Sequence, residues 1–197
     1  MTPDQLDSEL VTGSRAEPVL FAEIFDRHHA DLYRYLRHRV GATLAADLAA
    51  ETFVTAFARR AAFRPERTSV RPWLYGIAHN LLRNHVRREQ RRVAAYARYG
   101  ADPVADPGAV AEFALADERA DSAAVRSRLA PILGRMRPGD RDVLLLVAWA
   151  DLSYAEVAQS LGIPVGTVRS RMNRVRRQVR AVAETESLDI LLGERHG

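Results

Sequence analysis

Apolar residues recur every three or four positions through most of this chain, which is the spacing of one face of an α-helix. Residues 1–125 contain no stretch in which apolar and polar residues alternate as they do in a half-buried strand. The first helical pattern starts at Phe21 and ends at Gly41, and a second starts at Thr43, which can cap its first turn. The buried side of the second helix is predicted to contain Leu44, Leu48, Phe53, Ala56 and Phe57.

A polar stretch separates these helices from a third, longer one. Residues 64–71 are rich in charge and include a proline, so they are predicted to form a loop. Pro72 then begins a helix whose core side is marked at intervals of four. The marking residues are Trp73, Ile77, Leu81 and His85. We expect Trp73 to be in the core and Tyr75 to be exposed, and the later part of the helix carries five arginines.

Residues 153–180 have the local signals of a helix-turn-helix. Ser153 and Glu156 fit a capping box, in which each side chain bonds the other residue's backbone N–H. Gly162 follows the first helix where a left-handed residue is needed, and Pro164 suits the first turn of the next. The second helix buries one predicted stripe, Val168, Met172, Val175 and Val179.

The remaining faces of this second helix are basic. It carries six arginines within twelve residues and no acid among them, so like charges repel unless a polyanion binds there. The major groove of DNA admits an α-helix, and the planar fork of arginine matches guanine or a phosphate. This helix is therefore predicted to read duplex DNA.

Two shorter helices precede the helix-turn-helix. Apolar residues between positions 129 and 136 predict the first, and those between 143 and 150 predict the core of the second. Asp140 follows Pro138 and Gly139 and is predicted to cap the second helix. The C-terminal domain is thus expected to contain four helices around one small core.

The distribution of charge divides the chain. Residues 19–99 carry fifteen arginines and seven acids, and residues 126–181 carry eleven arginines and four acids. Residues 100–125 hold six acids and one arginine, and include prolines and glycines typical of a linker. We therefore predict an all-α chain with two small helical domains, 19–99 and 126–181, joined by a flexible acidic linker at 100–125. Residues 1–18 and 182–197 are predicted to be tails. Two basic bodies favour a nucleic-acid partner.

Several kinds of function are disfavoured by the residues. The chain has no cysteine, and its histidines are not spaced as metal ligands, so no metal site and no cofactor is expected. Asp47 and Glu51 lie one helical turn apart, but no second polar cluster completes a catalytic site, so no catalytic residue is assigned and an enzyme is not expected. The longest apolar run, 143–150, is too short to cross a membrane, and a signal-peptide pattern is lacking at the start. A cytoplasmic location is expected.

The order of these parts resembles the extracytoplasmic-function (group IV) RNA polymerase sigma factors of the sigma-70 family. The first body resembles sigma region two in four stretches, 21–40, 46–53, 71–80 and 87–88. The second body resembles sigma region four in residues 152–158 and 166–172. A helix-turn-helix alone is common among regulators, whereas the two matches in this order are specific to the family.

The resemblance implies a role for each region. Sigma factors of this type dock on the clamp helices of the polymerase's largest subunit and on its flap, and the matching clamp residues here are Asp47, Leu48 and Glu51. The minus-10 element would be melted and read by Arg64, Arg67, Arg71, Tyr75, His79, Asn80, Arg83, Arg87 and Arg88. The minus-35 element would be read by Thr167, Arg169, Ser170, Arg171, Arg174 and Arg177. A separate anti-sigma factor is expected as a regulatory partner, because residues 182–197 are too short for a further domain.

A second hypothesis stays open on the residues alone. The C-terminal domain by itself could belong to a stand-alone helix-turn-helix regulator that binds duplex operator DNA. Such a protein would bind its operator without polymerase, whereas a sigma factor would need core polymerase to act at a promoter.

Overall fold

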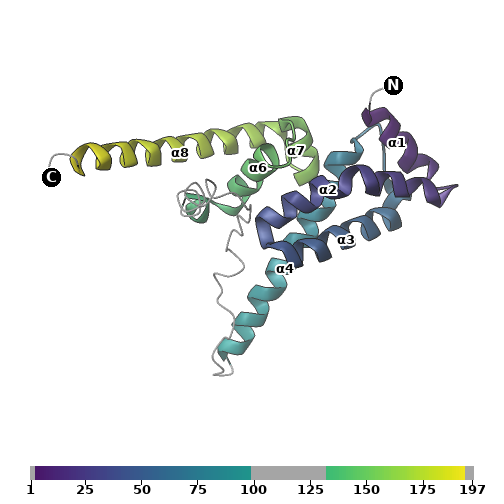
Figure 1. Ribbon diagram of the computed structural model, residues 1–197, viewed down its shortest axis with the longest axis horizontal. Helices are drawn as coiled ribbons and strands as arrows, with labels where there is room; N and C mark the ends of the chain where they lie inside the picture. Colours follow the sequence, from purple (N-terminus) through teal and green to yellow (C-terminus); the bar gives the residue numbers. More distant parts are fainter. Residues whose placement is uncertain (1–2, 99–131, 194–197) are drawn as a thin grey trace.

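The structure, a computed structural model, describes residues 3–98 and 132–193 (Figure 1). Within these residues all regular structure is helical, which confirms the all-α prediction. The predicted acidic linker, 100–125, lies outside the described residues. The N-terminal body contains α1 (Pro3–Gly13), α2 (Phe21–Val40), α3 (Ala42–Arg59) and α4 (Val70–Arg98), with the short 3₁₀ helices η1 (Pro18–Leu20) and η2 (Arg60–Ala62) between them.

The prediction of a tail for residues 1–18 is wrong, because α1 packs on α2 and α4. Val11 is fully buried in the core of the N-terminal body. Asp7 is also buried, and its carboxylate accepts a hydrogen bond of 3.0 Å from Arg27 and contacts the His28 ring nitrogen at 2.7 Å. One acid of the predicted tail, Asp7, is thus paired with two residues of α2, and the segment becomes part of the domain.

The bend between α2 and α3 depends on a glycine. Gly41 has a φ of 78°, a left-handed conformation that a side chain would strain, and it ends α2 as predicted. The next helix begins at once at Ala42, and no side chain caps it. Thr43 is therefore an exposed residue inside the first turn of α3, and its predicted role as a cap is wrong.

The prediction that Tyr75 is exposed is wrong, whereas Trp73 packs against the core as expected. Tyr75 is 3 % exposed and packs edge-on against Tyr35 with ring centroids 5.2 Å apart, whereas Trp73 is only partly buried, against Phe63. α4 begins at Val70 and packs against both α3 and α7, so its first turns have more than one buried side. A single apolar stripe in the sequence could not indicate the second of these contacts.

The C-terminal body contains a helical turn at 132–135, α6 (Pro138–Ala148), α7 (Tyr154–Leu161) and α8 (Val165–Gly193). The capping box is confirmed: Glu156 N–H donates to the Ser153 hydroxyl at 3.3 Å, and Ser153 N–H donates to the Glu156 carboxylate at 2.8 Å. Gly162 is left-handed with a φ of 63°, as predicted. α8 continues to Gly193, so the tail predicted after residue 181 is helical over most of its length.

The buried stripe of α8 is shorter than predicted. Val168, Met172 and Val175 are buried, but Val179 is 39 % exposed because the other helices of the body do not reach that far along α8. Figure 1 shows α8 extending away from α6 and α7 as a single long rod.

The two bodies pack against each other through α4 and α7. Buried residues from both form one continuous apolar cluster. The Ser160 hydroxyl on α7 donates a buried 2.9 Å hydrogen bond to the carbonyl oxygen of Pro72 on α4, and Thr68 donates to the side-chain oxygen of Gln159 at 3.2 Å. Figure 1 shows the later part of α4 and the later part of α8 pointing away from this contact.

Candidate nucleic-acid and polymerase interfaces

The outer face of α3 carries two of the three residues predicted to bind polymerase. Asp47 and Glu51 are exposed and lie one turn apart. Leu48 lies beside these acids on the helix but is 3 % exposed, so its side chain packs in the core and is not on the surface. Leu48 can hold α3 in place, but it offers no contact to another protein in this structure.

An apolar patch continues this face of α3. Val54 is 69 % exposed, and Phe57 is 36 % exposed with the guanidinium of Arg60 lying 3.9 Å from its ring centroid. Exposed apolar side chains beside acids suit a protein partner better than nucleic acid. The sequence analysis missed Val54, although the signal was present: Val54 is a large apolar residue outside the buried stripe of its helix.

The 64–69 loop and the later part of α4 form an exposed cationic surface. Arg64 and Arg67 are exposed in the loop, and the Arg64 guanidinium donates to the carbonyl oxygens of Ala61 and Phe63 at 2.9 and 3.0 Å. Further residues predicted to bind the minus-10 element are exposed along α4, namely Asn80, Arg83, Arg87 and Arg88. These residues are available to phosphates or bases as the structure stands.

Three other residues predicted to contact the minus-10 element are covered. Arg71 is half-buried, and its guanidinium donates a hydrogen bond to the carbonyl oxygen of Ala150, just after α6. Tyr75 is buried between helices of the N-terminal body, and burial raises the pKa of its hydroxyl. His79 is 4 % exposed and lies under α6.

The surroundings of His79 set its protonation state. The pKa of His79 is lowered to about 4, mainly by burial and also by the charges of Arg39 and Arg83, while Asp142, 3.8 Å away, opposes the shift. His79 is therefore neutral at physiological pH. Asp142 is held mainly by Arg39, which donates to it at 2.6 Å and to the Tyr35 hydroxyl at 2.8 Å. These contacts connect α2 and α4 to α6 across the boundary between the two bodies.

The arginines of α8 fall into two groups. Arg169 and Arg177 are exposed, together with Ser170, and Thr167 is half-buried in the first turn. Arg171 instead donates to the carbonyl oxygen of Gly139 at 3.3 Å, on α6. The first group is available to DNA, whereas Arg171 is engaged inside the body.

Arg174 is held by an acid that the sequence pattern did not reveal. Its guanidinium donates two hydrogen bonds, of 3.0 and 2.8 Å, to the carboxylate of Asp140, which is 1 % exposed. These bonds raise the pKa of Arg174. The prediction that Asp140 caps α6 is wrong: no side chain caps that helix, and the carboxylate points to α8 instead. Asp140 lies 34 positions from Arg174, so periodicity within α8 could not show the pair.

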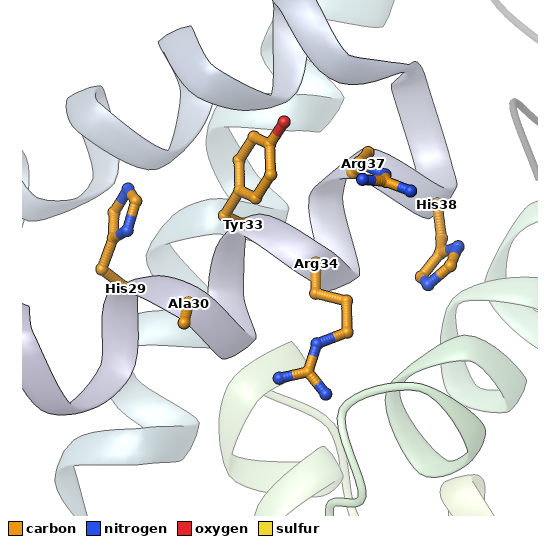
Figure 2. A pocket seen from close by; sticks show the side chains of 6 residues that line it. All are labelled: His29, Ala30, Tyr33, Arg34, Arg37 and His38. Carbon is orange, nitrogen blue, oxygen red and sulfur yellow. The ribbon is translucent and has the colours of Figure 1, made fainter. Parts of the chain in front are cut away.

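A cationic hollow of about 450 Å³ lies on α2, away from the predicted site residues. Figure 2 shows its six lining residues, which all come from this one helix, with Tyr33 and Arg34 pointing to opposite sides. Arg34 is paired with Asp31 on the same helix. Nothing in this arrangement selects a particular ligand.

The described residues hold no group of three or more side chains suited to binding a metal ion. Among the helices they form, none has both the length and the apolar character needed to span a bilayer.

Comparisons with known proteins agree with this geometry. Residues 24–92 match sigma-70 region 2, and residues 126–179 match sigma-70 region 4. The ECF RNA polymerase sigma factor SigC of Mycobacterium tuberculosis is 31 % identical over 159 residues, which is 80 % of each chain. The sigma factor CnrH of Cupriavidus metallidurans is 30 % identical over 193 residues, 95 % of this chain and 99 % of CnrH.

Solved structures share the fold. CnrH in complex with the cytosolic domain of CnrY aligns with a TM-score of 0.62 at 23 % identity, over 91 % of this chain and 98 % of CnrH. The sigma factor RpoE of Bartonella quintana, in complex with the anti-sigma factor NepR, aligns with a TM-score of 0.60 at 20 % identity, over 83 % of this chain and 96 % of RpoE.

Two cationic helical bodies, the second built around a helix-turn-helix, define a DNA-reading transcription protein with two modules. The chain belongs to the extracytoplasmic-function group of the sigma-70 family of RNA polymerase sigma factors. It is a promoter-specificity subunit that acts with core RNA polymerase in transcription initiation.

Proposed function

We propose that this sigma factor uses three separate surfaces, one for polymerase and two for promoter DNA. The exposed face of α3, with Asp47 and Glu51, docks on the clamp helices of the largest polymerase subunit. Val54 extends this contact as an apolar neighbour of the acids. The observation that carries the proposal is that these exposed surfaces lie on three different helices, α3, α4 and α8, so one chain can hold polymerase and two DNA elements together.

The minus-10 surface consists of the 64–69 loop and the later part of α4. Exposed arginines there can bind the phosphates of an opened strand, while the Asn80 amide can read a base edge. Extrusion of one base from the stack costs a few kcal/mol, roughly, and is easiest where the strand is already unpaired. Because Arg71, Tyr75 and His79 are covered, their predicted contacts require the two bodies to separate or the side chains to move.

The minus-35 surface is the first half of α8. Arg169 and Ser170 lie on its exposed side and can reach base edges in the major groove, and Thr167 and Arg177 can reach phosphates. Arg171 and Arg174 would reach DNA only after release from Gly139 and Asp140. We therefore propose that Arg169 and Arg177 carry the minus-35 contact and that Arg174 has a mainly structural role.

The chemistry of transcription belongs to polymerase in this scheme, so the sigma factor itself is not an enzyme and needs no cofactor. The sigma factor acts in the cytoplasm. RpoE of Bartonella quintana has been solved with an anti-sigma factor, and we propose that a protein of that class also controls the present chain.

The test is reconstituted transcription. Purified chain and core polymerase are incubated separately and together with a library of promoter-like duplexes, and the RNA products are sequenced. RNA that starts at defined positions only when both proteins are present supports the proposal. A stand-alone regulator would give a different result. It would bind a duplex site tightly by itself, and core polymerase would make the same RNA with it as without it.

The α3 surface is tested by a second experiment. Changing Asp47 and Glu51 together to asparagine and glutamine should weaken co-purification with core polymerase while the thermal melt of the isolated protein is unchanged. The matched control is Glu23→Gln, an exposed acid on α2. Full co-purification of the double variant would remove these acids from the polymerase contact.

A further inference from the structure

The turn that follows α1 is hydrogen-bonded to the segment that leads into the 64–69 loop. Arg15, in this turn, donates to the carbonyl oxygens of Phe63 at 2.7 Å and of Arg60 at 3.3 Å. Arg60 donates in return to the carbonyl oxygen of Ser14 at 3.1 Å. The start of the loop is therefore held in place relative to α1.

α1 is itself anchored to the N-terminal body, so it can support the loop. Val11 is fully buried, and the buried Asp7 is paired with two residues of α2. Ser14, directly after α1, is also fully buried, and its hydroxyl donates to the carbonyl oxygen of Val11 at 2.7 Å. The turn that carries Arg15 thus starts from a buried position in the domain.

Arg60 links the same turn to the end of α3. Its guanidinium donates to the carbonyl oxygen of Phe57 at 2.7 Å and lies over the Phe57 ring, in addition to its bond with Ser14. The carbonyl oxygen of Arg60 accepts from the backbone N–H of Phe63 at 3.2 Å and from Arg15. Hydrogen bonds therefore hold residues 60–63 from both sides, up to the point where the loop begins.

The carbonyl oxygen of Phe63 accepts from two guanidinium groups. Arg15 donates to it at 2.7 Å, and Arg64 donates to it at 3.0 Å. Phe63 follows the last residue of η2 and has an extended backbone. The carbonyl of a residue just past a helix needs a partner from elsewhere in the chain, and here side chains supply it.

The two donors differ in their freedom to move. Arg64 is exposed in the loop, and it donates to the carbonyl oxygens of Phe63 and Ala61 from the same nitrogen. A phosphate would compete with these bonds, and a partly buried carbonyl left without a donor would oppose the transfer. Because Arg15 also donates to the Phe63 carbonyl, this oxygen keeps a partner when Arg64 turns to DNA. Like charges that share one acceptor repel each other, which favours the transfer further.

We propose that Arg15 is a positioning residue for the minus-10 surface. It holds the start of the 64–69 loop and keeps the Phe63 carbonyl bonded, so that Arg64 is free to bind a phosphate of the opened strand. This role rests on the minus-10 function proposed above for the loop. It gives a function to α1 and its turn, which precede the match to sigma region 2 that begins at residue 24.

The experiment measures how tightly holoenzyme binds a single DNA strand. Holoenzyme is assembled from core polymerase and the full chain. The probe is a fluorescent oligonucleotide with the non-template sequence of the minus-10 element, taken from a promoter that the wild type selects in the transcription library. The variants are Arg15→Ala, Arg64→Ala and the double variant. The matched control is Arg59→Ala, which removes an exposed arginine at the end of α3.

Arg64→Ala should weaken binding of the strand, because it removes the phosphate contact. Arg15→Ala should weaken this binding about fivefold, the factor that corresponds to one net hydrogen bond. In the Arg64→Ala background, the loss of Arg15 should have no further effect, because Arg15 acts only through Arg64. Arg59→Ala should match the wild type. Every variant should bind core polymerase and a minus-35 duplex as the wild type does.

Several results would overturn the role of Arg15. Additive effects in the double variant would mean that Arg15 contacts the strand directly or acts through the stability of the whole domain. Weaker binding of Arg15→Ala to the minus-35 duplex would indicate a general loss of folding. An equal loss of strand binding in Arg59→Ala would mean that removing any nearby positive charge is sufficient.

The results for Arg64 distinguish this inference from the function on which it rests. If Arg64→Ala binds the strand as tightly as the wild type does, the minus-10 function of the loop fails, and the role of Arg15 fails with it. If Arg64→Ala weakens binding and Arg15→Ala does not, only the role of Arg15 fails.

Discussion

The backbones of Gly76 and Ser160 touch where the two bodies meet. A Cβ on Gly76 would lie 2.9 Å from the carbonyl oxygen of Ser160, closer than real Cβ contacts allow. Gly76 belongs to α4 and Ser160 to α7, and both positions are in regular helix. The approach of α4 to α7 therefore depends on the missing side chain of one residue.

The substitution Gly76→Ala should loosen this contact. Alanine favours a helix over glycine by about 1 kcal/mol, so α4 itself should not weaken. Because the chain has no cysteine, single cysteines at Ala58 and Gln178 can carry a fluorescent donor and acceptor. Energy transfer between the two bodies should fall in Gly76→Ala. The control is Gly134→Ala, where an added Cβ meets nothing within 4 Å. Equal energy transfer in both variants would show that the contact tolerates the methyl group.

The buried His79 makes stability depend on pH. The folded protein takes up a proton at His79 only near its pKa of about 4, whereas the unfolded chain does so near pH 6.5. Above pH 6.5 proton uptake at His79 does not contribute to the free energy of unfolding. As the pH falls through this window, proton uptake favours the unfolded chain, and the cost reaches about 2 kcal/mol at pH 5.

The contribution of His79 is measured by difference. Urea unfolding at pH 7.5 and pH 5 should show that His79→Gln loses about 2 kcal/mol less stability than the wild type between these conditions. All other side chains are the same in the two proteins, so their contributions cancel in the comparison. An equal loss in both proteins would mean that His79 is accessible to protons in the folded state.

Two arginines one turn apart on α8 should behave differently when replaced. Arg174→Ala leaves the buried carboxylate of Asp140 without its two hydrogen bonds, so the melting temperature should fall. Arg177→Ala removes an exposed cation, so the melting temperature should stay the same. Promoter binding should weaken, and the slope of log binding constant against log salt concentration should become shallower by about one unit. Calorimetry and binding titrations over a range of salt check both. The double variant Arg174→Ala with Asp140→Asn should recover part of the lost stability, and no recovery would argue against the pair.

The exposed Val54 should matter to polymerase and not to the fold. Val54→Ser should weaken binding to core polymerase about tenfold, because each buried methylene contributes about 0.8 kcal/mol. The free energy of unfolding of Val54→Ser should differ from that of the wild type by less than about 0.5 kcal/mol, as is usual for exposed sites. The comparison variant is Ala94→Ser, exposed near the end of α4. Competition binding to core polymerase measures the effect, and equal affinity for the two variants would place Val54 outside the contact.

Features that depend on neighbours in the sequence could be predicted. The capping box of Ser153 and Glu156 and the left-handed Gly162 are local, since their hydrogen bonds and dihedral angles involve only a few residues. The spacing of apolar residues that predicts α4 and α8 is also a local feature. These features were sufficient to define the helix-turn-helix and the all-α class.

Features that depend on distant partners could not be predicted in this way. α1 is stabilised by contacts with α2 and α4, and its own composition resembles a tail. The pairing of Arg174 with Asp140 joins two helices, and the burial of Tyr75 depends on Tyr35 of α2. For the same reason the sequence pattern could not show which arginines are exposed to DNA and which are already engaged.

The hydrogen bond from Arg71 to the carbonyl oxygen of Ala150 affects how the free protein, not bound to polymerase, interacts with DNA. A chromosome contains a vast excess of non-specific DNA sites. Each guanidinium that is free to contact a phosphate strengthens the binding of a basic protein to these sites. With the two bodies together, this arginine is satisfied by a peptide group of its own chain. In this arrangement Arg71 adds nothing to the binding of chance sites, whereas Arg64 and Arg67 in the neighbouring loop stay exposed.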